Sequence, residues 1–184
     1  MTPMMQQYFE IKNQYKDYVL FYRLGDFYEM FFDDAILASR VLELTLTGRD
    51  CGEAERAPMC GVPFHSAEGY IAKLVSKGYK VAICEQVENP ATAKGIVRRD
   101  VIRTITPGTV MEDSMLDEGR NNYLASIAIC GGEIGLCFTD ASTGECYVTS
   151  LSGSNLCDKI IEELSRFRPK ELLIDQKFIK SNTV

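Results

Sequence analysis

The residues best suited to do chemistry in this chain are an aromatic ring and a carboxylate two positions apart, Phe27 and Glu29. They follow a Gly-Asp pair flanked by apolar residues, and glycine at the first central position suits a two-residue hairpin turn. On an extended second arm Phe27 and Glu29 share one face, while Tyr28 and Met30 point toward a core. The pattern predicts a hairpin that exposes a ring beside an acid. The alternative from spacing alone is that Phe27 packs inside and Glu29 is a solvated edge residue.

A second candidate is a basic cluster between residues 89 and 107. Its members are Lys94, Arg98, Arg99 and Arg103, with Asp100 as the single acid. The whole chain has a net charge of −6, with 13 Lys and Arg against 15 Asp and Glu in residues 1–112 and 7 against 11 in residues 113–184. Positive charge that could face phosphate is therefore local, which predicts weak and salt-sensitive nucleic-acid binding. The alternative is an edge strand that carries charge to resist aggregation.

The elements expected around these residues are both helices and strands. Thr2 can cap a first helix with Pro3 at its first position, and Asp33 or Asp34 can cap a second helix. The inward stripe of that second helix is expected at Leu37, Ala38, Val41 and Leu42. Further expected elements are strands at 19–23 and about 27–32, a Gly- and charge-rich loop at about 48–63, a helix from Ser66 to Gly78 with Ala67, Tyr70, Ile71, Leu74 and Val75 inward, a buried strand at 81–84, and a basic edge strand at 96–106.

The pattern changes after residue 111. Residues 112–122 are charged, poor in apolar side chains and contain Gly119, which predicts an interdomain linker. Three strands joined by Gly-rich turns should follow, then a helix, then a further strand. They are expected at 123–130, 134–140, 145–150 and 171–174, with the helix burying Ile160, Ile161, Leu164 and Phe167.

Several kinds of site are disfavoured by the sequence. The seven cysteines form no C-x-x-C pair, and several lie in apolar strands, so we expect reduced thiols in a cytosolic protein. His65, the only histidine, is expected to be a structural hydrogen-bonding residue. Asp140 ends a strand without the further carboxylates that a nuclease needs. Residues 48–52 lack the Gly-Lys-Ser/Thr ending of a phosphate loop. No apolar run is long enough to span a membrane, and no secretory signal is expected.

Six segments in order carry a resemblance to a known family. They are residues 2–8 (TPMMQQY), 21–31 (FYRLGDFYEMF), 58–65 (PMCGVPFH), 81–86 (VAICEQ), 90–95 (PATAKG) and 106–109 (TPGT). At this nearly continuous spacing, the first part of the chain resembles the mismatch-recognition domain of the MutS family of DNA mismatch repair proteins. The resemblance implies an α+β fold with a mixed β-sheet covered by helices, followed by a truncated ribonuclease H-like α/β connector domain. The implied boundaries are 1–111 for the first domain, 112–122 for the linker and 123–184 for the connector.

The resemblance also implies a function and its residues. In that family a Phe-x-Glu element meets the mispaired base, and here it falls on Phe27 and Glu29. Backbone-positioning contacts to DNA are expected from Arg49, Arg99 and Lys94; no catalytic or metal-binding residue is expected. The implied partners are mismatched duplex DNA, a MutL-like protein at the connector and a second copy in the full-length protein. ATP and Mg²⁺ are expected only for the full-length, cytoplasmic protein. The alternative is a related scaffold that acts in recombination or as a protein-interaction module.

The chemistry of such a site follows from the two side chains. A mispaired step is easier to unstack and bend, and base–aromatic stacking is worth ~1–3 kcal/mol, so Phe27 can sample duplex weakness without reading sequence. Glu29 is harder to explain because base edges offer mainly acceptors. We therefore expect Glu29 to take up a proton when bound, since nearby phosphates and desolvation disfavour a charged carboxylate. On undistorted DNA it would remain charged and repel the backbone.

Overall fold

The computed structural model describes residues 1–52, 55–89, 93 and 95–175, and it forms two compact units. Unit 1 is Met1–Ile105 and unit 2 is Thr106–Val184. The segment 112–122, which the sequence predicts to be a linker, contains a short 3-10 turn, η2 (Asp113–Met115). Among the described residues, no helix is both long and apolar enough to cross a membrane.

Unit 1 is built on a six-stranded mixed sheet. From one edge to the other its strands are β3 (Thr47–Arg49), β4 (Ala57–Pro63), β2 (Phe27–Phe31), β1 (Tyr18–Leu24), β5 (Lys80–Gln86) and β6 (Arg99–Ile105). Strands β1 and β5 pair in parallel, and the other neighbours pair antiparallel. The expected edge strand at 96–106 is therefore present as the shorter β6, with the basic residue Arg99 at its start.

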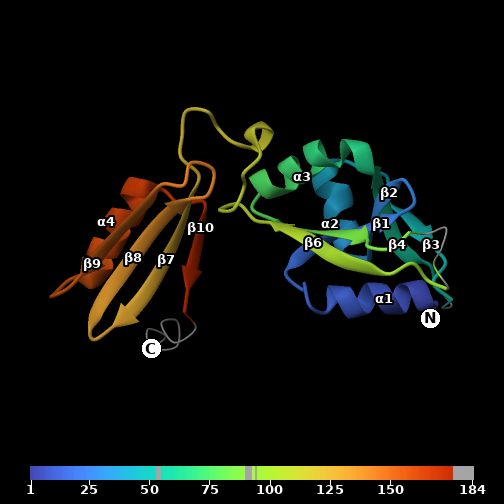
Figure 1. Cartoon of the computed structure of the whole chain (residues 1–184), viewed down its shortest axis with the longest axis horizontal. Helices are drawn as coiled ribbons and strands as arrows, with labels where there is room; N and C mark the ends of the chain where they lie inside the picture. Colours follow the sequence, from blue (N-terminus) through green and yellow to red (C-terminus); the bar gives the residue numbers. More distant parts are fainter. Residues whose placement is uncertain (53–54, 90–92, 94, 176–184) are drawn as a thin grey trace. The chain divides into compact units, whose positions relative to one another are not determined.

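Three helices cover the two faces of this sheet (Figure 1). Helix α1 (Pro3–Lys12) lies on one face, and α2 (Phe32–Leu42) and α3 (Ala67–Ser76) lie on the other. The short turn η1 (Phe64–Ser66) precedes α3. Successive residues of each strand point to opposite faces of the sheet, so every second side chain faces α1. The core under α1 is rich in aromatic and sulfur-containing side chains. Its buried members are Met5, Tyr8, Ile11, Leu20, Tyr22, Phe31, Cys51, Ala57, Ala82 and Cys84.

The hairpin formed by β1 and β2 agrees with the sequence prediction. Leu24 pairs with Phe27, so Gly25 and Asp26 are the two turn residues. Gly25 has φ 58°, a left-handed conformation that glycine adopts without a side-chain clash. Helix α3 also agrees: Gly78 follows its end with φ 89°, and four of its five expected inward residues are buried, with Tyr70 half-buried.

The first expectation for unit 1 that was wrong concerns residues 48–63. Much of the 48–63 segment is strand, because β4 pairs with β2 on one side and β3 on the other and buries Ala57, Cys60 and Val62. Its glycines and prolines resemble loop composition, but Pro63 lies at the end of the strand, and Pro58 lies opposite Gly48 beyond the last β2 pair. The alternation of its side chains favours a strand and its composition favours a loop. Pairing with a strand on each side decides in favour of the strand.

The second helix also begins earlier than predicted. Neither Asp33 nor Asp34 caps it, since α2 starts at Phe32 and both acids lie in its first turn. Asp34 points inward, accepting hydrogen bonds from the Leu20 backbone N–H at 3.0 Å and from Lys12 Nζ at 2.9 Å. Burial raises the pKa of this carboxyl. The inward stripe therefore runs through Asp34, Ala35, Ala38 and Leu42, while Leu37 and Val41 are only half-buried.

At the first helix, Thr2 occupies the predicted N-cap position and Pro3 the first turn, but the Thr2 side chain makes no capping bond. Thr2 Oγ1 is buried, and no hydrogen-bond partner for it lies among the described residues. Backbone hydrogen bonds hold the start of the helix instead. Thr2 N–H donates to the Cys51 carbonyl at 2.9 Å, and the Thr2 carbonyl accepts from the backbone N–H groups of Met5 and Gln6 at 3.0 Å each.

Unit 2 has the predicted order of three antiparallel strands, a helix and a returning strand. The sheet order is β10-β7-β8-β9, in which β10 is parallel to β7. Gly131 and Gly132 form the first turn with φ 59° and 87°. The bounds are β7 (Tyr123–Cys130), β8 (Glu133–Asp140), β9 (Cys146–Leu151), α4 (Leu156–Phe167) and β10 (Glu171–Ile174). Helix α4 packs Ile160 and Phe167 on the sheet, but Ile161 is exposed, contrary to expectation, because it lies outside the contact stripe.

The cysteine environments allow a direct test of the described fold. Burial raises the pKa of Cys60 to about 11 and that of Cys84 to about 12. Cys146 is exposed, and hydrogen bonds from Thr139 and Cys137 lower its pKa. Because the thiolate is the reactive form, iodoacetamide at neutral pH should alkylate Cys146 well before Cys60 or Cys84. Its rate should level off at a lower pH than that of an ordinary thiol.

Peptide mass spectrometry over a time course gives the order of modification, and the exposed Cys157 is the matched accessible control. Cys60 and Cys84 should react at rates similar to Cys157 only in denaturant. Native modification of Cys60 as fast as that of Cys146 would contradict the described packing of unit 1.

Candidate nucleic-acid interface

The candidate interface begins with Phe27, which stands at the start of β2 directly after the hairpin turn. Its ring is 47% exposed, whereas Tyr28 and Met30 on the opposite face of the strand are 7% and 0% exposed. Phe31 shares the face of Phe27 but is buried under α1, where its ring packs edge-on against Tyr8 at 5.1 Å. The same sheet face is thus covered by α1 at one end and leaves Phe27 uncovered at the other.

Glu29 lies between these two rings and is bound by Arg49. The Arg49 guanidinium donates to the Glu29 carboxylate in an ion pair, with side-chain exposures of 37% and 15%. Gly61 lies opposite Glu29 on β4, and a Cβ there would approach the Tyr28 carbonyl at 3.3 Å and Glu29 Cγ at 3.4 Å. Glycine therefore leaves space for the Glu29 side chain. In the free protein the acid is neutralised by a cation that was itself expected to contact DNA.

Arg99 is held by contacts within unit 1. It donates to the Arg23 carbonyl at 2.7 Å, to Gln7 Oε1 at 3.0 Å and to the Val97 carbonyl at 3.0 Å. Its guanidinium also lies 5.0 Å from the centre of the Tyr22 ring. Burial raises the pKa of Tyr22 to about 12, although the charge of Arg99 opposes this rise. Arg99 therefore connects α1, β1 and β6 on the α1 face of the sheet.

The base of the hairpin is braced by residues that sequence reasoning missed. Arg23 donates to the Gly25 carbonyl at 2.6 Å and to Glu85 at 3.2 Å, and its guanidinium lies 3.7 Å from the centre of the Phe64 ring. Tyr28 donates its hydroxyl hydrogen bond to the same Glu85, and burial together with Glu85 raises the Tyr28 pKa to about 12. The sequence of residues 21–28 (FYRLGDFY) does not predict this network, because Glu85 and Phe64 are distant from it in sequence. These contacts stiffen the turn that carries Phe27.

The remaining predicted residues lie elsewhere. Lys94 lies outside the described residues. Arg98 is a largely exposed side chain beside Asp100 at 3.9 Å. Asp140 is buried in unit 2; burial raises its pKa, but hydrogen bonds from Ser142 and the Asn122 backbone outweigh this and lower it.

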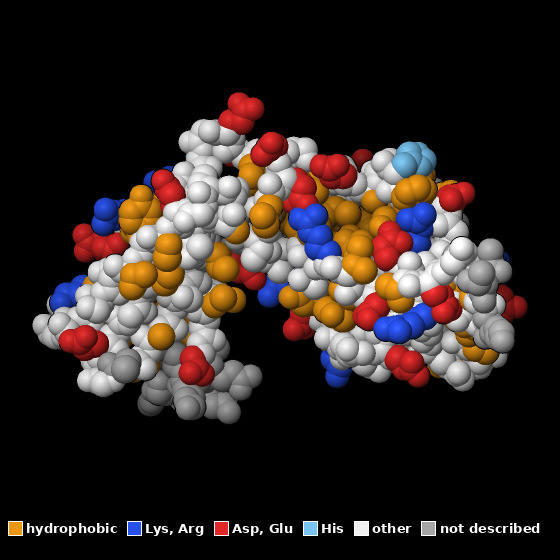
Figure 2. Space-filling model, viewed as in Figure 1, with side chains coloured by type: hydrophobic (Ala, Val, Ile, Leu, Met, Phe, Trp, Pro, Cys, Tyr) orange, Lys and Arg blue, Asp and Glu red, His pale blue; other side chains and the backbone are white. Residues whose placement is uncertain are grey.

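Among the described residues no group of three or more His, Cys, Asp and Glu could hold a metal ion. In Figure 2, basic side chains are interspersed with acidic ones and form no continuous band on the face shown.

The internal contacts of Arg99 lead to a specific expectation for Arg99→Ala. Hydrogen bonds that involve a charged group contribute about 1.5–3 kcal/mol, so the variant should lose stability of that order. A phosphate contact by Arg99 would also reduce the slope of DNA affinity against salt by about one. Thermal unfolding and a salt titration measure the two effects separately. Arg98→Ala is the matched control and should change neither, while an Arg99→Ala protein with unchanged Tm would contradict the network.

Comparison with known proteins places the chain in a family. The MutS domain I family model matches residues 2–114, and the MutS domain II family model matches residues 122–184. The chain is 60% identical over 181 residues to the DNA mismatch repair protein MutS of Ruminiclostridium cellulolyticum, covering 98% of the chain and 21% of that protein. The corresponding proteins of Acetivibrio thermocellus and Clostridioides difficile are 59% and 60% identical over 184 and 181 residues, covering 100% and 98% of the chain and 21% and 19% of those proteins.

Two mixed sheets with covering helices, one of them presenting an exposed aromatic hairpin, define a two-unit α+β protein. The chain belongs to the MutS family, as the matched domain models and the identity across nearly its whole length show. It spans about a fifth of the length of the curated relatives that it matches.

Proposed function

We propose that this chain recognises mispaired or unpaired bases in duplex DNA during mismatch repair, by inserting Phe27 into the base stack. The observation that carries this proposal is the exposed Phe27 ring on a hairpin in which Tyr28 and Met30 are buried and Arg23 and Tyr28 both donate to Glu85. Its membership of the MutS family, with relatives named as DNA mismatch repair proteins, supports the same role.

The energetics favour a sensor of duplex weakness. Unstacking one base step costs a few kcal/mol and costs least at a mismatch. Stacking a base on an aromatic ring returns ~1–3 kcal/mol. The two terms nearly cancel on a weakened step, whereas on an intact step the penalty exceeds the gain. A wedge of this size is therefore selective because its stacking energy is modest.

Glu29 and Arg49 supply a second selective element in this proposal. In the free chain Arg49 neutralises Glu29. A bent duplex brings a phosphate close enough to compete for the Arg49 guanidinium, which binds phosphate well. Glu29 then loses its counter-charge among phosphates, takes up a proton and donates a hydrogen bond to an acceptor on the displaced base. A matched duplex resists bending, so Glu29 remains charged and repels it.

We further propose that ATP and Mg²⁺ are used outside this chain, that a second copy shares the DNA in the full-length protein, and that unit 2 contacts a MutL-like partner. A cytoplasmic, nucleoid-associated location would follow from that role. The alternative of a recombination or protein-interaction scaffold has no need of an exposed ring at Phe27 beside Glu29, which favours mismatch recognition.

The proposal is tested with a chimera in which this chain replaces the matching region of the Clostridioides difficile relative. Fluorescence anisotropy is measured with a duplex that contains one G·T mismatch and with the matched duplex, and the unaltered relative serves as the positive control. The chimera should bind the mismatched duplex more tightly, by a ratio close to that of the relative. Equal affinity for both duplexes, in a chimera that folds as the relative does, would refute the proposal.

A further inference from the structure

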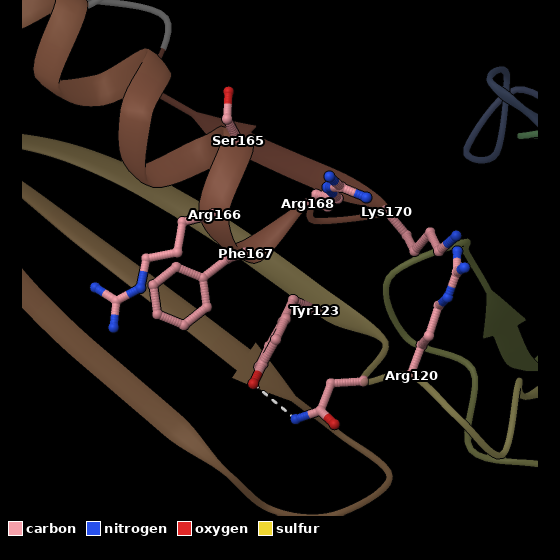
Figure 3. A pocket seen from close by; sticks show the side chains of 8 residues that line it. Arg120, Tyr123, Ser165, Arg166, Phe167, Arg168 and Lys170 are labelled. Atoms are coloured by element: carbon pink, nitrogen blue, oxygen red, sulfur yellow. Dashed lines mark hydrogen bonds between the residues drawn. The ribbon is translucent and has the colours of Figure 1, made fainter.

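Unit 2 contains a basic pocket that has no part in the proposed role of the hairpin (Figure 3). Its volume is about 620 Å³, and it lies where the end of α4 meets the segment that leads into β7. We call it the α4 pocket. Its lining residues are Arg120, Asn121, Tyr123, Ser165, Arg166, Phe167, Arg168 and Lys170.

The charge of this pocket is opposite to that of its surroundings. Unit 2 has seven Lys and Arg against twelve Asp and Glu, yet four of the seven cations line the α4 pocket. Arg120 and Arg166 have acidic neighbours at 3.8 and 3.7 Å, Asp117 and Glu163, in long and exposed pairs that water screens strongly. Among the described residues, the structure gives Arg168 and Lys170 no ion-pair partner. The α4 pocket therefore concentrates positive charge on an otherwise acidic unit.

The backbone at Arg168 is a second feature of this pocket. Arg168 caps α4 with φ 49°, and its N–H donates to the Leu164 carbonyl at 2.8 Å. This left-handed position ordinarily favours glycine, and a side chain such as arginine is strained there. Figure 3 shows Arg168, Lys170 and Arg120 on one side of the pocket, with Arg166 on the other side of Phe167. A strained arginine beside an unpaired lysine suggests that the cations serve a ligand and not the fold.

We propose that the α4 pocket binds a phosphate group. Three arginines and a lysine present planar forks and a point charge, and a phosphate can satisfy several of them at once through its acceptor oxygens. Ser165 adds a neutral polar group, whereas Asn121 Nδ2 already donates to the Tyr123 hydroxyl at 2.6 Å and to Glu145 at 2.7 Å. The phosphate can come from a nucleic-acid strand or from a free nucleotide or inorganic phosphate, and the experiment distinguishes these sources.

The test uses the whole 184-residue chain labelled with ¹⁵N and titrated with sodium phosphate, pyrophosphate, AMP or a thymidine oligonucleotide at constant ionic strength. Saturable amide shifts should appear at Asn121, Tyr123, Arg168 and Lys170. A phosphodiester source predicts the tightest binding for the oligonucleotide, and a free source predicts tighter binding of pyrophosphate or AMP.

The variant that tests the site is Arg168→Gly combined with Lys170→Gln. Glycine suits the left-handed position, and the Lys170 backbone N–H to the Tyr123 carbonyl is kept, so the chain should remain folded with an unchanged or raised Tm. Its affinity for the phosphate ligand should fall by about tenfold or more. Lys159→Gln removes a cation of unit 2 that lies outside the pocket and should leave the affinity within about twofold.

Absence of saturable shifts at the pocket with every phosphate ligand would overturn the proposal, as would equal binding by the double variant. A polyglutamate peptide is the competing ligand class. Its binding in the pocket, with no binding of phosphate, would overturn the proposal in favour of an acidic protein partner. Phe27→Ala should not change phosphate binding here, so this result is independent of the hairpin.

Discussion

Phe27→Ala is expected to remove most of the preference of the chimera for mismatched DNA. The ring supplies stacking worth ~1–3 kcal/mol that only a weakened duplex makes available, so affinity for the G·T duplex should fall by about 5- to 150-fold. Affinity for the matched duplex should change little, because an intact stack does not admit the ring. Fluorescence anisotropy with both duplexes measures the two affinities.

Two controls separate the wedge from a general loss of structure. Because the Phe27 ring is 47% exposed, the alanine variant should keep the Tm of the parent protein. Phe27→Tyr retains the ring but adds a hydroxyl that loses water within the stack, so its discrimination should lie between those of the parent and of Phe27→Ala. Equal loss of affinity for both duplexes in a folded Phe27→Ala protein would mean that the ring contributes only general apolar surface.

Glu29→Gln is the second change with a large expected effect, and it should raise affinity for matched DNA by about tenfold. An amide does not repel phosphate, and it can donate a hydrogen bond to a base without first taking up a proton. It also releases Arg49, whose guanidinium is then available to the DNA backbone. Discrimination should therefore shrink mainly because the matched duplex binds better. Unchanged discrimination in parallel titrations would defeat this account of Glu29.

A double-mutant cycle with Arg49→Gln separates the two contributions. If Glu29 acts only by repelling phosphate, the effects of Glu29→Gln and Arg49→Gln should add. If Arg49 must leave Glu29 to reach a phosphate, Glu29→Gln should raise affinity far less when Arg49 is absent. The Glu29 side chain is only 15% exposed, so each single change should lower stability by about 1.5–3 kcal/mol. Thermal unfolding of each variant checks this condition.

The sequence by itself determined the elements whose pattern is local. Alternation along residues 27–31 decides which side chains share a face, and Gly25 permits the tight turn, so the hairpin and the separation of Phe27 from Tyr28 and Met30 were predictable. Helical spacing likewise predicted most of the buried face of α3, and the Gly131-Gly132 turn marked the first hairpin of unit 2. The family resemblance also led to the prediction that Phe27 and Glu29 meet the base, which no spacing rule could make.

Only the tertiary structure decided which partner each side chain takes. Residues 57–63 resemble a loop in composition, and they become a central strand because β2 and β3 pair with both of their edges. Arg49 and Glu29 are twenty residues apart and meet across β4 in an ion pair. The cations of the α4 pocket come from two separate segments, Arg120 and residues 166–170. Such contacts depend on long-range strand order and packing, and the free energy that selects them is not encoded in the period of any single segment.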